Sequence, residues 1–453
     1  MTIQQLRSRR DFLRLGCRTI STVGAAAAFG KAGLMTARAQ SSGNYQAIVC
    51  IFLFGGNDAN NMLVPNDAVT YANYQKIRQN LALPQSSLVT IHDPATNADY
   101  GLHPSFAPIA PLYNSSKRLA VLANVGTLVQ TVPQGSNGLP NLTSVPLPVN
   151  LYSHSDQQNE WQNAVPQGGA TTGWSGRLAD KLAGGSGTLV PPCISISGNT
   201  LQLIGENTQP STVNTSNFGL VAPATDPGST ALLNMLSLSS GVTLIQAAQS
   251  SLKDAIAVAQ AVNAAVAGSS SLGVTFANTD IGTQLAQVAK LIQVRAALGA
   301  TRQIFFCSQG GYDTHSNQLP QQVTLFTNLA NAMAAFDQAM GLLTVQSNVT
   351  TFTESDFNRT FQPNGNAGTD HGWGSHALIM GGAVNGGNLY GTFPILTLAG
   401  PDDSTNRGTW VPSTSEDQYA GALAKWFGLS AQADLDYVFP NLRNFNYQTP
   451  AFI

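Results

Sequence analysis

The feature that most constrains the fold is an almost unbroken apolar run, QAIVCIFLFGG, at residues 46–56. A run of this kind, ending in two glycines, is typical of a strand that is buried on both faces of a parallel sheet. Similar runs follow along the chain at LAVLANVG (119–126), CISISG (193–198), RQIFFCSQGG (302–311) and NVTTFTESDF (348–357). We therefore predict that these runs form the strands of one mainly parallel sheet.

Helical patterns separate the apolar runs. They cover residues 104–116, 283–298, 322–343 and 417–428. Strands that alternate with helices favour an α/β fold with a mainly parallel central sheet and helices on both faces.

The 453 residues are enough for one large domain or two ordinary ones. We predict a single α/β domain over residues 40–453. Residues 199–280, low in charge and rich in Ser, Thr and Ala, are interpreted as a cap or insertion, with a helix near 243–267. Residues 127–150, rich in Pro, Gly, Asn and Thr, are interpreted as a long excursion from a strand end.

The N-terminus has the pattern of an export signal. SRRDFLRLG (8–16) is basic, TISTVGAAAAFG (19–30) is weakly apolar, and ARAQ (37–40) ends in an A-x-A site. This order predicts a signal peptide over residues 1–39, and its Arg-Arg pair resembles the twin-arginine type. The alternative is a short membrane anchor, but the apolar stretch is short and Gly-rich for a span. We expect a periplasmic or secreted protein, exported by the twin-arginine route, with no stable membrane span after signal cleavage.

The composition excludes one class of partner. Only 10% of residues are charged, against roughly 25% in a typical soluble protein, and the net charge is −2. No basic stripe is present to neutralise phosphates, so we expect no nucleic-acid binding. The mature chain would keep Cys50, Cys193 and Cys307, whose wide spacing is neither a disulfide framework nor a zinc motif. We interpret Cys50 and Cys307 as small buried apolar residues.

Four polar segments contain most of the residues that can carry chemistry. They are GGNDANNMLVP (55–65), YSHSDQQNEW (152–161), GGYDTHSNQ (310–318), and a stretch from TESDFNRT (353–360) to TDHGWGSH (369–376). Three of them begin where a predicted strand ends, which is where ligands bind in open α/β sheets. Most of the histidines and several aspartates fall in these segments: His154, His315, His371, His376, Asp58, Asp313, Asp356 and Asp370.

Imidazoles and carboxylates together are the ligand set for a divalent metal. Zinc or manganese is favoured by this mixture, whereas calcium or magnesium, also possible, prefers a shell made more purely of oxygen. The alternative for any one segment is ordinary loop hydrogen bonding, in which Asp and Asn cap turns. His103 is interpreted as structural and His92 as a surface residue. The repeated Gly–Asp–His chemistry favours a metal site.

Several of these motifs resemble one known family. GGND (55–58), SHSD (153–156), GGYDTH (310–315) and DHGWGSHALIMGGAVNGGNLYG (370–391) resemble DUF1501, a family of exported bacterial proteins. That family is similar to the alkaline phosphatase and sulfatase superfamily of hydrolases, which use one or two metal ions. The resemblance covers nearly the whole mature chain and implies an alkaline phosphatase-like fold.

The resemblance also implies roles for individual residues. Asp58 matches the early metal-binding aspartate, and His376 would supply a late histidine. The pairs Asp370/His371 and Asp313/His315 match the remaining ligand positions. Because the spacings within and after these pairs are shorter than is usual in the superfamily, one divalent ion is implied rather than two.

The catalytic residues implied by the resemblance are Ser153, His154 and Arg359. Ser153 would be the nucleophile at a helix N-terminus, activated by the metal or by His154, and the alternative is a capping role. The Arg359 guanidinium matches phosphate or sulfate oxygens, although it could instead pair with Asp356. No Cys-x-Pro-x-Arg motif is present, so the formylglycine of ordinary sulfatases cannot form.

The sequence therefore predicts an exported metal-dependent hydrolase acting on a small anionic substrate, a phosphate or sulfate ester. The alternative is a non-catalytic exported protein with a structural metal site, in a cell-surface or extracellular-polymer assembly. A third possibility, a phosphotransferase or mutase, is disfavoured by the export signal because sugar-phosphate metabolism is mainly cytosolic. The sequence indicates no particular protein partner.

Overall fold

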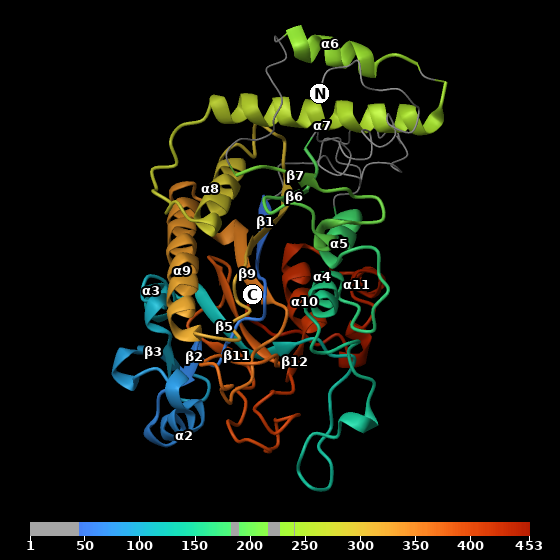
Figure 1. Cartoon of the computed structure of the whole chain (residues 1–453). Coiled ribbons are helices and arrows are strands. Elements are labelled where there is room, and N and C mark those ends of the chain that lie inside the picture. Colours follow the sequence, from blue (N-terminus) through green and yellow to red (C-terminus); the bar gives the residue numbers. More distant parts are fainter. Residues whose placement is uncertain (1–44, 183–189, 216–226, 240) are drawn as a thin grey trace.

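The computed structural model describes residues 45–182, 190–215, 227–239 and 241–453 (Figure 1). The predicted signal peptide, residues 1–39, lies outside the described residues. No helix in the described ranges combines the length and the apolar character that a membrane span requires.

The core of the molecule is a nine-stranded sheet with the order β11-β5-β10-β9-β1-β8-β6-β7, and β12 also pairs with β5. Strand β10 is antiparallel to both of its neighbours, and the other pairs are parallel. The predicted mainly parallel sheet is thus confirmed. Its strands are β1 (Gln46–Leu53), β5 (Leu119–Gly126), β6 (Cys193–Ser195), β7 (Ser211–Thr212), β8 (Arg302–Gln309), β9 (Val349–Ser355), β10 (Ser375–Gly381), β11 (Leu389–Gly391) and β12 (Thr414–Ser415).

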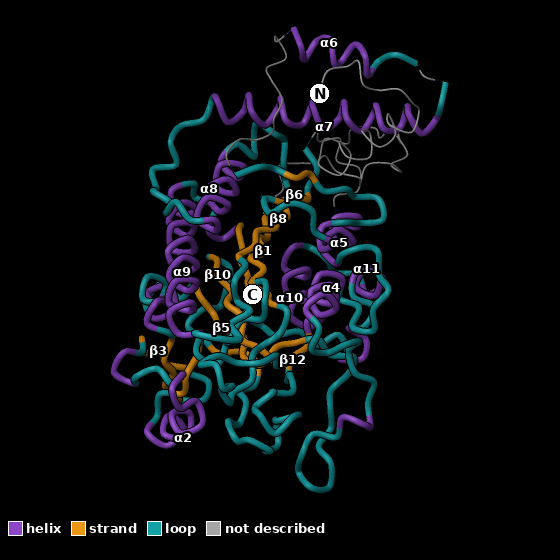
Figure 2. The backbone as a smooth tube through the Cα atoms, in the orientation of Figure 1, coloured by secondary structure: helices purple, strands orange, loops and turns teal. Residues whose placement is uncertain are grey.

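Helices cover both faces of this sheet, as predicted (Figures 1 and 2). Successive side chains of β1 point to opposite faces, so Val49 and Ile51 join one apolar cluster while Cys50 and Phe52 join the other. The helices of the first face are α3 (Ala110–Asn114), α8 (Asp280–Gln293) and α9 (Gln318–Leu342). Those of the second face are α4 (His154–Asn163), α5 (Trp174–Leu182), α10 (Glu416–Phe427) and α11 (Gln432–Val438).

The helix predicted over residues 104–116 is much shorter than expected. The chain forms a 3-10 turn at Pro104–Phe106 and then the one-turn helix α3. Pro104, Pro108 and Pro111 lack the backbone N–H that a continuous helix would use, which explains the interruption.

A small antiparallel sheet lies beside the main one, with the order β2-β4-β3. It consists of β2 (Leu63–Pro65), β3 (Val89–Asp93) and β4 (Ala98–Leu102), and helix α2 (Ala68–Arg78) follows β2. This helix is important for the site described below, because its last residue is a buried arginine.

Helices α6 (Pro227–Leu236) and α7 (Thr243–Ala267) belong to the stretch that the sequence analysis interprets as an insertion. Figure 1 shows both at the end of the molecule where β6 and β7 lie. The helix predicted near 243–267 is present, whereas the role of residues 199–280 as a cap remains a proposal.

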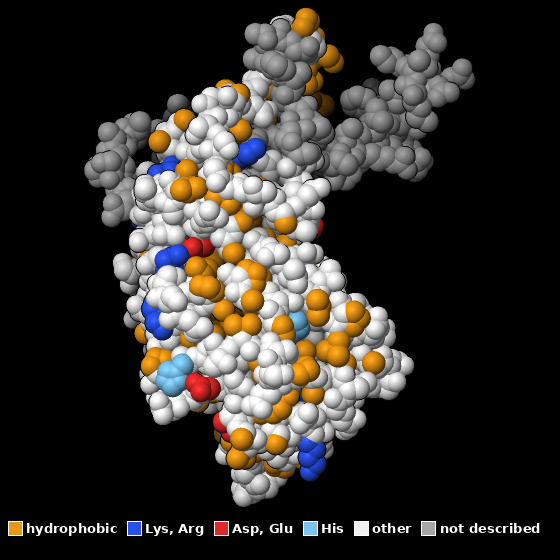
Figure 3. Space-filling view, turned by 90° about the vertical axis from the view of Figure 1, so that its left-hand side faces the viewer, with side chains coloured by type: hydrophobic (Ala, Val, Ile, Leu, Met, Phe, Trp, Pro, Cys, Tyr) orange, Lys and Arg blue, Asp and Glu red, His pale blue; other side chains and the backbone are white. Residues whose placement is uncertain are grey.

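The surface and the cysteines agree with the composition. In Figure 3, which views the side that carries α9, charged side chains are few and most of the surface is uncharged. Cys50, Cys193 and Cys307 are free and buried, and burial raises the pKa of each thiol. The interpretation of Cys50 and Cys307 as buried apolar residues is confirmed.

Candidate metal centre

The sheet brings distant polar segments to one edge. Strands β1, β8 and β9 end in register, with Leu53 opposite both Gln309 and Ser355. Strand β10 runs in the opposite direction, so its first residue, Ser375, lies at that edge and pairs with Val125 near the end of β5. The residues that follow β1, β8 and β9 therefore meet those that precede β10.

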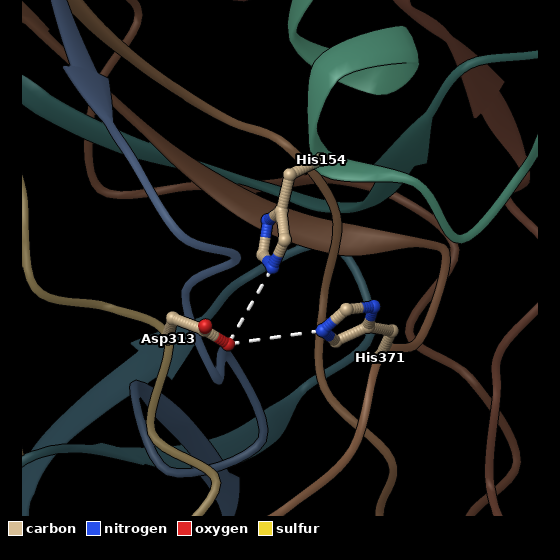
Figure 4. Close-up of side chains that lie close together, drawn as sticks. All are labelled: His154, Asp313 and His371. Carbon is tan, nitrogen blue, oxygen red and sulfur yellow. Dashed lines mark ion pairs between the residues drawn. The ribbon is translucent and has the colours of Figure 1, made fainter.

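Four side chains converge at this edge. One ligand atom from each of His154, Asp313 and His371 lies within 4.8 Å of the others (Figure 4). The Asp313 Oδ1 atom is 3.5 Å from His154 Nε2 and 3.7 Å from His371 Nε2. His315 joins them, because its Nε2 is 3.1 Å from Asp313 Oδ1 and 2.9 Å from His371 Nε2. Tetrahedral zinc with bonds of about 2.0–2.1 Å requires ligand atoms roughly 3.3 Å apart. The separations of Asp313 Oδ1 from the three Nε2 atoms, and of His315 Nε2 from His371 Nε2, lie close to that value.

The outer ring nitrogen of each histidine has its own partner. The Nδ1 atom of His154 is 2.7 Å from Asp356 Oδ2, and that of His371 is 2.8 Å from the Tyr152 carbonyl oxygen. A carbonyl only accepts, so His371 Nδ1 carries the hydrogen and its Nε2 presents a lone pair to the centre. The Nδ1 atom of His315 is 3.3 Å from Asp370 Oδ1, in the same arrangement. Histidines that bind metals almost always donate their other N–H to a carboxylate or carbonyl in this way.

The carboxylates of the centre are held in the ionised form. Burial would raise the pKa of Asp313, but the hydrogen bond and charge of Arg359 outweigh it, so the pKa is lowered. Burial likewise opposes ionisation of Asp370, yet Arg407 and Asn364 lower its pKa overall. A metal ligand must be deprotonated, and Asp313 meets that requirement near neutral pH.

The imidazoles differ from one another. The hydrogen bond to Asp356 raises the pKa of His154, while burial lowers the pKa of His371. His371 is therefore poised as a neutral ligand, whereas His154 holds a proton more firmly until a cation displaces it.

The charges of the centre leave an excess of negative charge. Asp313, Asp356 and Asp370 are opposed by two guanidinium groups, Arg359 and Arg407. With neutral imidazoles one negative charge remains, and a divalent ion would turn the local charge positive. Such a centre would then attract an anionic ligand.

Two of the predicted metal ligands lie elsewhere. Asp58 is buried in an ion pair with Arg78, and it also accepts hydrogen bonds from Gln318 and Asn60. Because these protein donors already surround its carboxylate, Asp58 is not part of the converging group. The prediction misplaced it because the sequence does not reveal that the last residue of α2 reaches back to this position.

His376 also falls outside the centre. It is the second residue of β10, its Nδ1 accepts the Asn124 backbone N–H at 3.0 Å, and its ring stacks on Phe393. Burial lowers its pKa to about 4. His376 lies five residues beyond His371 and is already part of strand β10, so its ring packs in the interior instead of at the edge.

Asp370 has a different role from the one implied. Its Oδ1 lies beside His315 Nδ1, and its Oδ2 is 2.6 Å from the Arg407 guanidinium. It therefore orients His315 instead of reaching the metal position itself.

The predicted catalytic residues Ser153 and His154 differ in where they lie relative to the centre. His154 lies among the candidate ligands. Ser153 is the N-cap residue of α4 but makes no side-chain cap bond, and its hydroxyl lies 3.2 Å from that of Ser155. Among the described residues, no contact joins the Ser153 hydroxyl to the centre.

Arg359 does not face the solvent. It is fully buried, and its donors bond the Gly56 and Thr369 carbonyl oxygens at 3.0 and 3.1 Å, as well as Gly55 and Asp313. The alternative, a pairing of Arg359 with Asp356, is not what the structure shows, because Arg359 pairs with Asp313. It fixes a candidate ligand and is not placed to touch a substrate.

The fold and this centre define an α/β protein with an imidazole–carboxylate cluster at the carboxyl edge of its sheet. The chain belongs to a family described as "Protein of unknown function (DUF1501)", whose model matches residues 45–407. This confirms the family resemblance drawn from the motifs. No curated protein matches the chain.

Among solved structures, the chain is similar to two crystal structures of Ps i-CgsB. The complex with k-i-k-neocarrahexaose is 8% identical, with 90% of this chain and 77% of that one covered and a TM-score of 0.33. The structure without that ligand is 10% identical over the same shares, with a TM-score of 0.32. These values are too low to assign a fold family or a function.

Proposed function

We propose that this protein is an exported metal-dependent hydrolase of phosphate or sulfate esters. The observation that carries the proposal is the convergence of three imidazole Nε2 atoms with Asp313 Oδ1, each imidazole being held from behind by a carboxylate or carbonyl. Zinc or manganese suits this set better than calcium or magnesium, because nitrogen ligands dominate. We also propose that the fold is alkaline phosphatase-like and that the protein is exported through a twin-arginine signal.

The residues present fit the chemistry of ester hydrolysis. A divalent ion held here would act as a Lewis acid and lower the pKa of a water molecule to about 7. Arg359 holds Asp313 in place, and His154 shares a proton with Asp356. Within the described ranges the Ser153 hydroxyl contacts Ser155 and not the centre, so we assign the attack on the ester to water instead of to this serine.

The alternative function, a structural metal site in a non-catalytic protein, also has an observation in its favour. Structural zinc sites are closed by four protein ligands, whereas catalytic sites have three and an open position. His154, Asp313, His315 and His371 together would make four. His315 decides between the two, because its side chain is 43% exposed and could leave the shell when a substrate enters.

Metal content and hydrolysis test the proposal together. Mature protein, residues 40–453, is purified and its metal content measured by mass spectrometry, and hydrolysis of p-nitrophenyl phosphate and sulfate is followed with and without chelator. We expect one zinc or manganese ion per chain and activity that chelation abolishes and metal restores. A protein that binds the ion, loses thermal stability on chelation and hydrolyses neither ester would be the structural alternative. A chain that binds no divalent ion would overturn both.

A further inference from the structure

A rigid loop, residues 403–409, stands next to the metal centre. The buried Asp403 carboxylate accepts the backbone N–H groups of four residues, at 2.9–3.0 Å: Ala399, Thr405, Gly408 and Thr409. The Gln362 backbone N–H also donates to the Arg407 carbonyl oxygen at 3.0 Å. The backbone that carries Arg407 is therefore fixed before any ligand arrives.

The loop is joined to the centre on two sides. On one side, Arg407 is 2.6 Å from an Asp370 oxygen, and the other oxygen of that carboxylate lies beside His315 Nδ1. On the other side, the Tyr152 hydroxyl is 3.5 Å from the Ser404 hydroxyl, while the Tyr152 carbonyl accepts the hydrogen of His371 Nδ1. The loop therefore lies beside two of the candidate ligands, His315 and His371.

Arg407 carries a partly exposed guanidinium beside the centre. Its side chain is 39% exposed, in contrast to that of Arg359, which is 0% exposed. Within the described part of the chain, the hydrogen bond to Asp370 occupies one of its terminal nitrogens, and a guanidinium has five N–H donors. His315, on the opposite oxygen of Asp370, is exposed to a similar degree. An anion that approaches the centre over His315 would therefore meet Arg407.

We propose that Arg407 is a specificity-determining residue that binds an oxyanion group of the substrate. The inference rests on the proposed function and deepens it, because it names the group that selects a sulfate or phosphate ester over a neutral ester. The fork of donors on a guanidinium matches two oxygens of a tetrahedral oxyanion. Asp370 orients the fork and holds it near the centre.

A purely positioning role for Arg407 makes a different prediction. If Arg407 served only to neutralise Asp370, its loss would disturb Asp370 and then His315, and the affinity for the metal would fall. If Arg407 binds the oxyanion, metal affinity stays nearly constant and oxyanion affinity falls. The two roles are separable by measuring both affinities in the same variants.

The experiment uses zinc-loaded mature protein and two probes, inorganic phosphate and inorganic sulfate, with binding measured by titration calorimetry. The variants are Arg407→Gln, Arg407→Lys and the control Arg443→Gln, in which an exposed arginine whose side chain bonds the nearby Pro440 carbonyl loses its charge. We expect Arg407→Gln to weaken the binding of at least one probe tenfold or more. The oxyanion affinity of Arg407→Lys should lie between those of the wild type and Arg407→Gln, since lysine keeps the charge but lacks the forked donors of the guanidinium. Arg443→Gln should bind like the wild type, and zinc affinity should change less than threefold in all three.

Two results would overturn the inference. One is equal oxyanion binding by the wild type and Arg407→Gln. The other is a parallel loss of zinc affinity that accounts for any loss of oxyanion binding, which would assign Arg407 a positioning role. Failure of the proposed function gives a different result. If the wild type binds zinc, and phosphate through Arg407, but hydrolyses no ester, the inference about Arg407 stands and the proposed hydrolase activity is wrong. Thermal melting of each variant confirms that it is folded.

Discussion

The Nε2 atoms of His315 and His371 lie 2.9 Å apart, although the Nδ1 atom of each ring is already directed at an acceptor. Two lone pairs at this distance repel unless a proton or a cation lies between them. A metal ion bound to both atoms, and to Asp313 beside them, would remove this repulsion.

The first prediction concerns this pair. His371→Ala removes one candidate ligand, so we expect zinc affinity to fall by at least two orders of magnitude. Competition with a chromophoric chelator measures that affinity. His92→Ala is the control, because His92 is an exposed histidine of β3 that also bonds a carboxylate. Equal zinc affinity in His371→Ala and His92→Ala would show that His371 is not a metal ligand.

A second prediction tests the residue behind His154. Asp356→Asn should weaken zinc binding roughly 10–100-fold, the usual cost of losing a partner that orients a metal-binding histidine. The matched control is Asp99→Asn, since Asp99 bonds His92 Nδ1 at 2.8 Å, almost the distance of 2.7 Å between Asp356 and His154. Zinc affinity of Asp99→Asn should equal that of the wild type.

The third prediction concerns Asp58, which the motif resemblance assigned to the metal. Arg78→Met leaves the buried Asp58 charge without its partner, so we expect the free energy of unfolding to fall by about 3–5 kcal/mol in urea denaturation. Lys181→Met, in the exposed pair with Asp434, should cost less than about 1 kcal/mol. Asp58→Asn should keep the full zinc content, and a loss of zinc there would restore the original assignment.

A fourth prediction concerns pH. Burial raises the pKa of Glu354 on β9 from 4.5 to about 8, so the folded chain keeps a proton that the unfolded chain releases. The stabilisation from this proton is complete below pH 4.5 and is lost as the pH rises through about 8. The urea concentration at the unfolding midpoint of the wild type should decrease as the pH rises from 5 to 9. The midpoint of Glu354→Gln should decrease less over the same range. An equal decrease in the two proteins would contradict the assignment to Glu354.

Much of the sheet could be predicted because its strands are long apolar runs. The strand predicted at 119–126 matches β5 at Leu119–Gly126, and the runs at 46–56 and 302–311 contain β1 and β8. Strand β10 was not among the predicted strands. It follows directly on a polar loop, and a short apolar run beside glycines does not reveal its direction or its place between β5 and β9.

The candidate site was predictable in its segments but less so in its members. Asp313, His315 and His371 converge because strand ends in one parallel sheet meet at one edge. The sequence analysis assigns His154 to catalysis as an activator of Ser153. Its place among the candidate ligands depends on how α4 packs against the loop that holds Asp356, which the sequence does not show. Arg407 was missed for a similar reason. In the sequence it is only a charged residue in a Gly-containing segment, and the shape of that loop depends on Asp403.

The reversed direction of β10 has a consequence for how the chain matures. His371 directly precedes β10, so its position at the edge depends on the place of β10 between β5 and β9. A fragment that ends before residue 381 lacks part of β10, so we expect it to bind zinc more weakly than the whole chain. Because ligands that bind only the native state add stability, about 2.7 kcal/mol when free metal is a hundredfold above Kd, an ion bound at the centre would stabilise the assembled sheet.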